Sequence, residues 1–106
     1  SGERTCQGGG PATARTLNPG DPFLLDASVV VDGYRGDFAN TWIVDGSPTP
    51  EMVRYSRLCL DAMGAGEALL LPGTPWRDVW AAVQAVFDHA GVGDRFGHHA
   101  GHGLGL

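Results

Sequence analysis

The sequence predicts an α+β fold in which an antiparallel β-hairpin is followed by two helices. The first observation behind this class is a pair of β-rich segments, residues 23–31 and 34–44, separated only by Asp32-Gly33, which is among the strongest short-range hairpin signals. The second is a pair of later segments whose apolar residues recur at intervals of three and four, the period of an amphipathic helix. At 106 residues the chain has room for one domain.

Composition and charge exclude several classes of function. The net charge is -5 and the seven Lys and Arg residues form no basic cluster, which argues against a nucleic-acid partner. The longest apolar run, residues 79–83, is far too short to span a bilayer, and the first residues contain no apolar signal region. Cys6 and Cys59 make no C-x-x-C spacing, so we expect free thiols. We therefore expect a cytoplasmic protein with no membrane partner.

Turn and cap signals set the expected element boundaries. Residues 1–21 should be loop with at most one short strand, and Asn18-Pro19-Gly20-Asp21 should form a turn before the hairpin. Thr49-Pro50 has the N-cap and first-turn proline of a helix that runs to about Glu67. Thr74-Pro75 repeats this pattern for a second helix, which should end before Gly91.

Both helices carry a regular apolar stripe, which is typical of a buried core rather than of an aromatic substrate wall. In the first helix the stripe consists of Met52, Tyr55, Cys59, Ala62 and Met63. In the second helix it consists of Trp76, Val79, Trp80, Val83, Val86, Phe87 and Ala90. We expect these side chains, including both tryptophans and both methionines, to be buried.

Two aspartates, Asp26 and Asp37, lie in the middle of the two expected strands. A two-residue type I′ turn at Asp32-Gly33 places Asp26 opposite Ala39 and Asp37 opposite Ser28. Side chains two apart on a strand share a face, so both carboxylates point the same way. As diagonal neighbours, their β carbons should lie roughly 6–8 Å apart.

If this face is covered, the carboxylate pair needs a positive charge nearby, because the repulsion between the two groups then adds to the cost of desolvation. A divalent cation with oxygen ligands would provide it. The alternative is a hydrated pair on a surface hairpin. Apolar residues on the opposite face, such as Leu25 and Val29, and others beside the carboxylates, Leu24 and Val30, lead us to expect that both faces are at least partly covered.

The last stretch, residues 92–106, is neither a regular helix nor an ordinary strand, because it is rich in glycine and its histidines are bunched. Gly101-His102-Gly103 surrounds one imidazole with residues that lack side chains, as expected where backbone passes close to an ion or substrate. His98 and His99 lie four and three residues earlier. Two alternatives are solvent-exposed loop histidines and a small zinc site built from the histidine cluster alone.

Taken together, GDPFLLDASVVVDGYRGD and GHHAGHGLGL resemble the first half of a pita-bread catalytic domain. This is the metallopeptidase family that includes methionine aminopeptidase, Xaa-Pro aminopeptidase (aminopeptidase P), prolidase and creatinase. The resemblance extends from about Gly2 to Leu106. The opening segment SGERTCQGGGPATARTLNPGD is more similar to the Xaa-Pro aminopeptidase and creatinase side of the family.

The resemblance implies a metal-dependent hydrolase that cleaves the N-terminal residue from peptides. It makes Asp26 a ligand of one metal ion, Asp37 a ligand bridging two ions, and His102 the imidazole ligand of the other. The two divalent ions (Mn, Co, Zn or Fe) would generate a bridging hydroxide at neutral pH. His98 matches a catalytic histidine that contacts the substrate or stabilises the transition state. We also expect the full-length protein to be a homodimer.

The sequence departs from the family pattern in three respects. The family's two further glutamate ligands and a later substrate-binding histidine fall after the GHG segment, so we expect residues 1–106 to be a partial catalytic domain that is inactive by itself. Residues 1–25 contain no histidine where the aminopeptidases usually have one. This absence leaves two alternatives open: a creatinase-like non-peptidase enzyme, and a metal-free scaffold or binding protein on the same fold.

Overall fold

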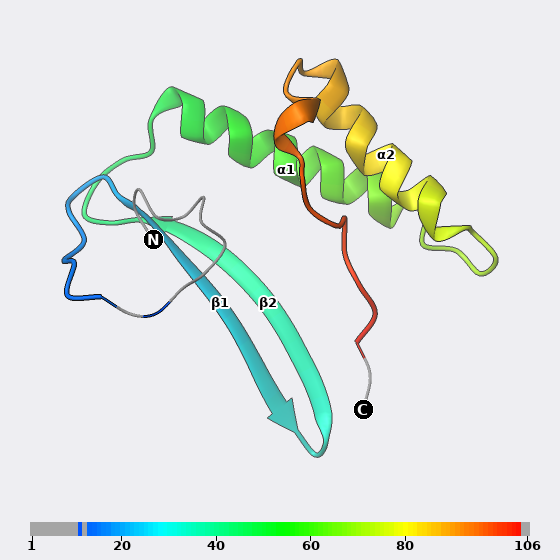
Figure 1. Cartoon of the computed structure of the whole chain (residues 1–106), viewed down its shortest axis with the longest axis horizontal. Coiled ribbons are helices and arrows are strands. Elements are labelled where there is room, and N and C mark those ends of the chain that lie inside the picture. Colours follow the sequence, from blue (N-terminus) through cyan, green and yellow to red (C-terminus); the bar gives the residue numbers. More distant parts are fainter. Residues whose placement is uncertain (1–10, 12, 105–106) are drawn as a thin grey trace. The chain divides into compact units, whose positions relative to one another are not determined.

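The computed structural model describes residue 11 and residues 13–104, and it has the predicted α+β architecture (Figure 1). The elements follow in the order β1 (Pro22–Val31), β2 (Tyr34–Ile43), α1 (Pro50–Glu67), α2 (Trp76–His89) and the short 3-10 helix η2 (Gly93–Arg95). They form two compact units, one containing the hairpin and the other consisting of Thr49–His102. None of the helices in the described part is long and apolar enough to cross a membrane.

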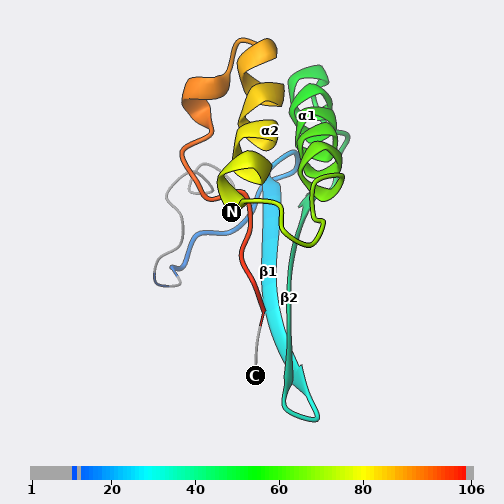
Figure 2. The same cartoon turned by 90° about the vertical axis from the view of Figure 1, so that its right-hand side faces the viewer.

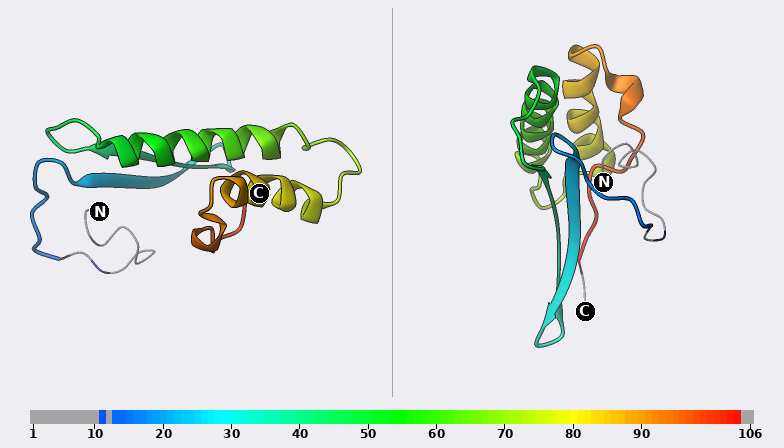
Figure 3. Two further views of the ribbon diagram at one scale, coloured as in Figure 1. Left: turned by 90° about the horizontal axis from the view of Figure 1, so that it is seen from above. Right: turned by 90° about the vertical axis from the view of Figure 1, so that its left-hand side faces the viewer.

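The hairpin has the predicted turn and register. Asp32 and Gly33 have φ values of 51° and 87°, the positive angles that a type I′ turn requires at both central positions. The strands are antiparallel, and Asp26 pairs with Ala39 while Ser28 pairs with Asp37. Figure 3 shows the result, a long two-stranded ribbon.

A second turn closes the open end of the hairpin, also as predicted. The Asp21 N–H donates to the Asn18 carbonyl at 3.0 Å, and Gly20 has a φ of 87°. Proline followed by a glycine with positive φ is the sequence signature of a type II turn. The Val44 N–H then donates to the Asp21 carbonyl at 3.0 Å, which extends the ladder beyond the strands.

Helix α1 begins as predicted, but α2 does not. The Thr49 hydroxyl accepts a hydrogen bond from the Met52 N–H at 3.2 Å, with Pro50 in the first turn. The predicted cap at Thr74 is wrong, because α2 begins at Trp76 after Pro75 and has no side-chain cap. The physical reason is that Pro75 occupies the cap position, so Thr74 lies one residue too early and belongs to the preceding turn, where its N–H donates to the Leu71 carbonyl at 3.0 Å.

Helix α2 runs back alongside α1 (Figure 2), and the core of this pair is smaller than predicted. The buried apolar residues of the described chain are Ala62, Val79, Val83 and Val92. The prediction was wrong for Met63, which is 67% exposed, for Trp76 and Trp80, at 51% and 41%, and for Cys59, which is also exposed. Two packed helices bury only one line of side chains each, so the edges of both stripes stay outside.

The expectation that both faces of the hairpin are covered is also wrong. Apolar residues on both faces are exposed, among them Leu24, Leu25, Val30 and Phe38. The described sheet has two strands only, so it has no second layer of its own to bury either face. Asp26 and Asp37 are correspondingly exposed.

Close packing of the helix pair depends on a glycine. Gly66 is buried near the end of α1, and a β carbon at this position would lie 2.8 Å from Val83 Cγ2 on α2. A valine side chain is stiff, so it cannot move aside without strain. Gly64, two residues earlier, has open space where its β carbon would be.

We predict that Gly66→Ala destabilises the complete gene product by about 1–3 kcal/mol, the usual cost of overpacking. Gly64→Ala is the matched control, because it should stabilise the helix by roughly 0.5–1 kcal/mol without a clash. Urea unfolding followed by circular dichroism measures both changes. Equal effects of the two substitutions would contradict the assigned role of Gly66.

Candidate metal centre

The hairpin places the two predicted carboxylate ligands on one face, close together. The backbone bond between Val44 and Asp21 fixes which cross-strand pairs are hydrogen-bonded, because such pairs alternate along an antiparallel ladder. By this alternation, Asp26↔Ala39 and Ser28↔Asp37 are non-hydrogen-bonded pairs. In such pairs the α carbons are only about 4.5 Å apart and the side chains approach most closely.

The polar side chains on this face, with Ala39 between them, form a small patch flanked by Leu24 and Val30. Ala39, directly across from Asp26, leaves room beside that carboxylate. Ser28, directly across from Asp37, donates its hydroxyl proton to the Gly36 carbonyl at 2.9 Å. From the register, the polar patch consists of Asp26, Ser28, Arg35, Asp37, Ala39 and Thr41.

The donor set of the patch suits a divalent metal ion. Two carboxylates on neighbouring strands supply the hard oxygen ligands that such ions prefer, and an imidazole such as that of His102 extends the range to Zn, Co, Fe and Mn. Among residue 11 and residues 13–104, however, no three His, Cys, Asp or Glu side chains are grouped so as to hold a metal. Within the hairpin the structure brings together two of the three predicted ligands, Asp26 and Asp37.

The segment that carries the histidines is anchored to the helix pair at its start. The Phe96 ring stacks on Phe87 of α2, with centroids 4.9 Å apart and planes 15° from parallel. Arg95 donates from Nη1 to the Tyr55 hydroxyl of α1 at 2.9 Å. Gln84 donates to the Gly93 carbonyl at 3.1 Å. The sequence analysis missed Arg95 and Phe96, although an Arg-Phe pair just before a histidine cluster is a signal that could have drawn attention to them.

Beyond Phe96 the three histidines lie against one another. The rings of His98 and His99 have centroids 3.9 Å apart, and those of His99 and His102 meet edge to face at 5.5 Å. All three residues are exposed. The observation agrees with the alternative of exposed loop histidines for this chain by itself, and it gives no support to a zinc site built from the cluster alone.

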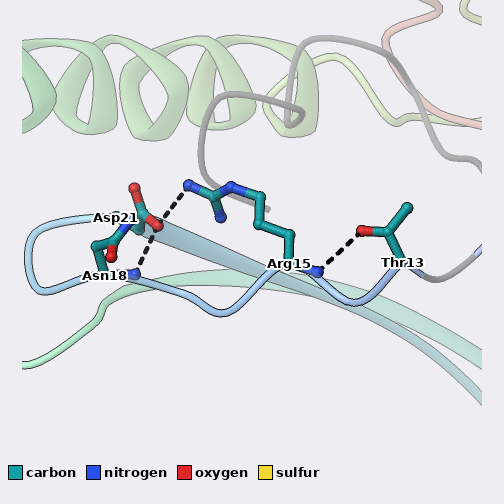
Figure 4. Close-up of polar contacts among 4 residues, drawn as sticks. All are labelled: Thr13, Arg15, Asn18 and Asp21. Atoms are coloured by element: carbon teal, nitrogen blue, oxygen red, sulfur yellow. Dashed lines mark hydrogen bonds and ion pairs between the residues drawn. The ribbon is translucent and has the colours of Figure 1, made fainter.

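An ion pair holds the loop that leads into β1 (Figure 4). Arg15 Nη2 lies 2.8 Å from Asp21 Oδ2, and the same oxygen accepts from the Asn18 N–H at 2.8 Å. The Arg15 N–H in turn donates to the Thr13 hydroxyl at 3.4 Å. The hydrogen bond from Asn18, followed by the one from Arg15, lowers the pKa of Asp21 below 3.8. Sequence analysis identified this turn but missed the arginine that secures it.

Comparison with known proteins assigns the class. The model of metallopeptidase family M24 matches residues 1–106. The chain therefore belongs to this family of metal-dependent peptidases, which confirms the predicted resemblance.

Several individual proteins are similar to this chain over its whole length. The chain is 32% identical to the uncharacterized peptidase YqhT and 35% identical to the putative dipeptidase YkvY, both of Bacillus subtilis, and 28% identical to the Xaa-Pro dipeptidase of Pyrococcus furiosus. These alignments cover 99–100% of this chain but only 29–30% of each relative. The chain thus spans less than a third of the length of these curated relatives.

Two solved structures confirm the fold. Prolidase from Pyrococcus furiosus superposes with a TM-score of 0.88 at 26% identity, over 98% of this chain and 31% of the prolidase. Dipeptidase PepE from Mycobacterium ulcerans gives 0.81 at 31% identity, over 89% of this chain and 25% of the dipeptidase. The hairpin and two helices are therefore part of the fold that these peptidases share.

We predict that the Asp21 carboxyl titrates below pH 3.8 and that Arg15→Gln moves its pKa only partway back, because the Asn18 N–H still favours the ionised form. A depressed pKa stabilises the fold at pH values above 3.8, and this contribution is lost as the pH falls through the lowered value. Carbon-13 NMR of the side-chain carboxyl measures the titration. Arg77→Gln, at an exposed ion pair with Asp78, is the control. A full return to 3.8 in Arg15→Gln would contradict the order of causes.

Proposed function

We propose that the protein carrying this chain is a metal-dependent hydrolase of the Xaa-Pro aminopeptidase or prolidase type, which removes the N-terminal residue from peptides. The observation that carries the proposal is the pair Asp26 and Asp37, placed on one face of the hairpin in adjacent non-hydrogen-bonded pairs. Membership of the M24 family and the Xaa-Pro dipeptidase and prolidase among the relatives support it.

In this proposal Asp26, Asp37 and His102 are the side chains that would hold the divalent ions. When bound, such ions (Mn, Co, Zn or Fe) supply Lewis-acid activation of the scissile carbonyl and a nucleophile at neutral pH. The two carboxylates give one face of the hairpin a negative electrostatic potential, which attracts cations to that face. Arg35, two residues before Asp37 on the same face, can hold an anionic part of the substrate near them.

His98 is the proposed catalytic side chain. An imidazole ring carries an N–H donor, so His98 can donate a proton or a hydrogen bond to the substrate as charge develops. His98 Nδ1 lies 3.4 Å from the His99 carbonyl. This contact can orient the ring and leave its other nitrogen for the substrate.

A creatinase-like reaction on a small polar substrate is the second candidate. It is favoured by one observation, the absence of histidine from residues 1–25. A metal-free scaffold is less well supported. Without a bound cation, the neighbouring carboxylates of Asp26 and Asp37 only repel each other and add no stability to the fold. We also carry forward two expectations for the complete protein, a cytoplasmic location and a homodimeric state, the second of which gel filtration with light scattering checks.

We predict that the complete gene product contains about two transition-metal ions per chain and that Asp37→Asn loses at least one of them. Asp32→Asn is the matched control, since it removes a carboxylate from the same hairpin while asparagine suits the type I′ turn equally well. Inductively coupled plasma mass spectrometry measures the metal. Metal-free wild-type protein, even after incubation with Mn or Co, would refute the metal site.

We predict that the metal-loaded protein hydrolyses Xaa-Pro dipeptides and that Asp37→Asn lowers kcat/KM by about 100-fold or more, since it removes a metal ligand. Release of free proline is the measurement, again with Asp32→Asn as the control. Turnover of creatine without turnover of any dipeptide would favour the second candidate.

A further inference from the structure

The polar patch contains a feature that the proposed ligand set does not use. Ser28 lies directly across from Asp37 and two residues from Asp26 on the same strand, so it is adjacent to both carboxylates. Its hydroxyl donates to the Gly36 carbonyl at 2.9 Å, and Gly36 is the residue immediately before Asp37. The bond therefore joins β1 to the peptide unit from which Asp37 projects.

Gly36 is a weak point in β2. Glycine loses the most conformational freedom on folding, and inside a strand it weakens the local structure. A β carbon at this position would lie 3.4 Å from Val29 Cγ2, an ordinary contact, so lack of space does not account for the glycine. The side-chain bond from Ser28 restrains this flexible residue at the point where the direction of the Asp37 side chain is set.

We propose that Ser28 is a positioning residue of the metal centre, which holds the Asp37 side chain in the orientation needed for metal binding by fixing the Gly36 peptide. The inference rests on the proposed metal site. Groups that orient a metal ligand without touching the metal commonly contribute about 10–100-fold to metal affinity. With its proton committed to the Gly36 carbonyl, the Ser28 oxygen also presents no proton that would compete for Asp37.

Calorimetric titration of the metal-free complete gene product with Mn²⁺ tests the proposal. We expect Ser28→Ala to weaken Mn²⁺ binding about 10-fold. Ser28→Thr should restore it, because threonine keeps the hydroxyl and suits a strand. Tyr34→Phe is the matched control: it removes a hydroxyl from the same hairpin but from the face opposite the polar patch, at the position across from Val31, and should leave the affinity unchanged.

A double substitution separates positioning from any other role of the hydroxyl. Gly36→Ala restricts the same peptide by removing the freedom of glycine, and the space for its methyl group exists. We therefore expect Ser28→Ala with Gly36→Ala to regain most of the lost affinity, which a direct contact between the hydroxyl and the metal would not allow.

Each outcome is decisive. Wild-type affinity in Ser28→Ala, or no recovery in both Ser28→Thr and the double variant, would overturn the positioning role while leaving the metal site intact. A wild-type protein that binds no Mn²⁺ would overturn the proposed function and this inference together. Circular dichroism melts confirm that each variant is folded, and if Ser28→Ala does not fold, Ser28→Thr compared with Ser28→Val makes the same test.

Discussion

The hydrogen-bonded register of the hairpin is the constraint on which the candidate site depends. Because the side-chain period of a strand is two, a slip of one residue in one strand would move its carboxylate to the opposite face. The Asp32-Gly33 turn joins the strands in this register, and at the other end the hydrogen bonds of Gly20 and Asp21 with Val44 continue it. The proximity of Asp26 and Asp37 is thus a consequence of backbone geometry, set by residues that are not themselves ligands.

In the second unit, the segment that carries His98 and His102 likewise depends on residues that are not themselves proposed ligands. Residues 96–104, the described part of the histidine segment beyond η2, form no helix or strand, so side-chain contacts at the start of the segment help to fix its position on the helix pair. Phe96 on Phe87 and Arg95 on Tyr55 fix its start against α2 and α1. Gly66 lets those helices approach closely enough for Val79 and Val83 to be buried. A small residue in the helix interface therefore supports the base from which His98 and His102 extend.

Local features were predictable from the sequence, whereas burial was not. The turn at Asp32-Gly33, the register and the cap at Thr49 follow from interactions within a few residues, and the structure confirms them. Trp76, Trp80 and Met63 were expected in a core and are exposed. Periodicity identifies the apolar side of a helix, but it does not reveal whether anything packs on the outer part of that side. For the same reason spacing alone could not place His102, since it lies more than sixty residues from the hairpin carboxylates in the sequence.

The exposure of the hairpin bears on how the metal centre would form. Two like charges at a fixed distance repel about four times more strongly at an effective dielectric constant of 20 than in water. On the exposed face water screens the repulsion between Asp26 and Asp37, and Arg35 on the same face offsets part of it. If Leu24 and Val30 were covered, water would leave the face and the repulsion would grow. A bound divalent cation would then offset the repulsion between the two carboxylates. Metal binding and burial of this face should therefore be thermodynamically coupled.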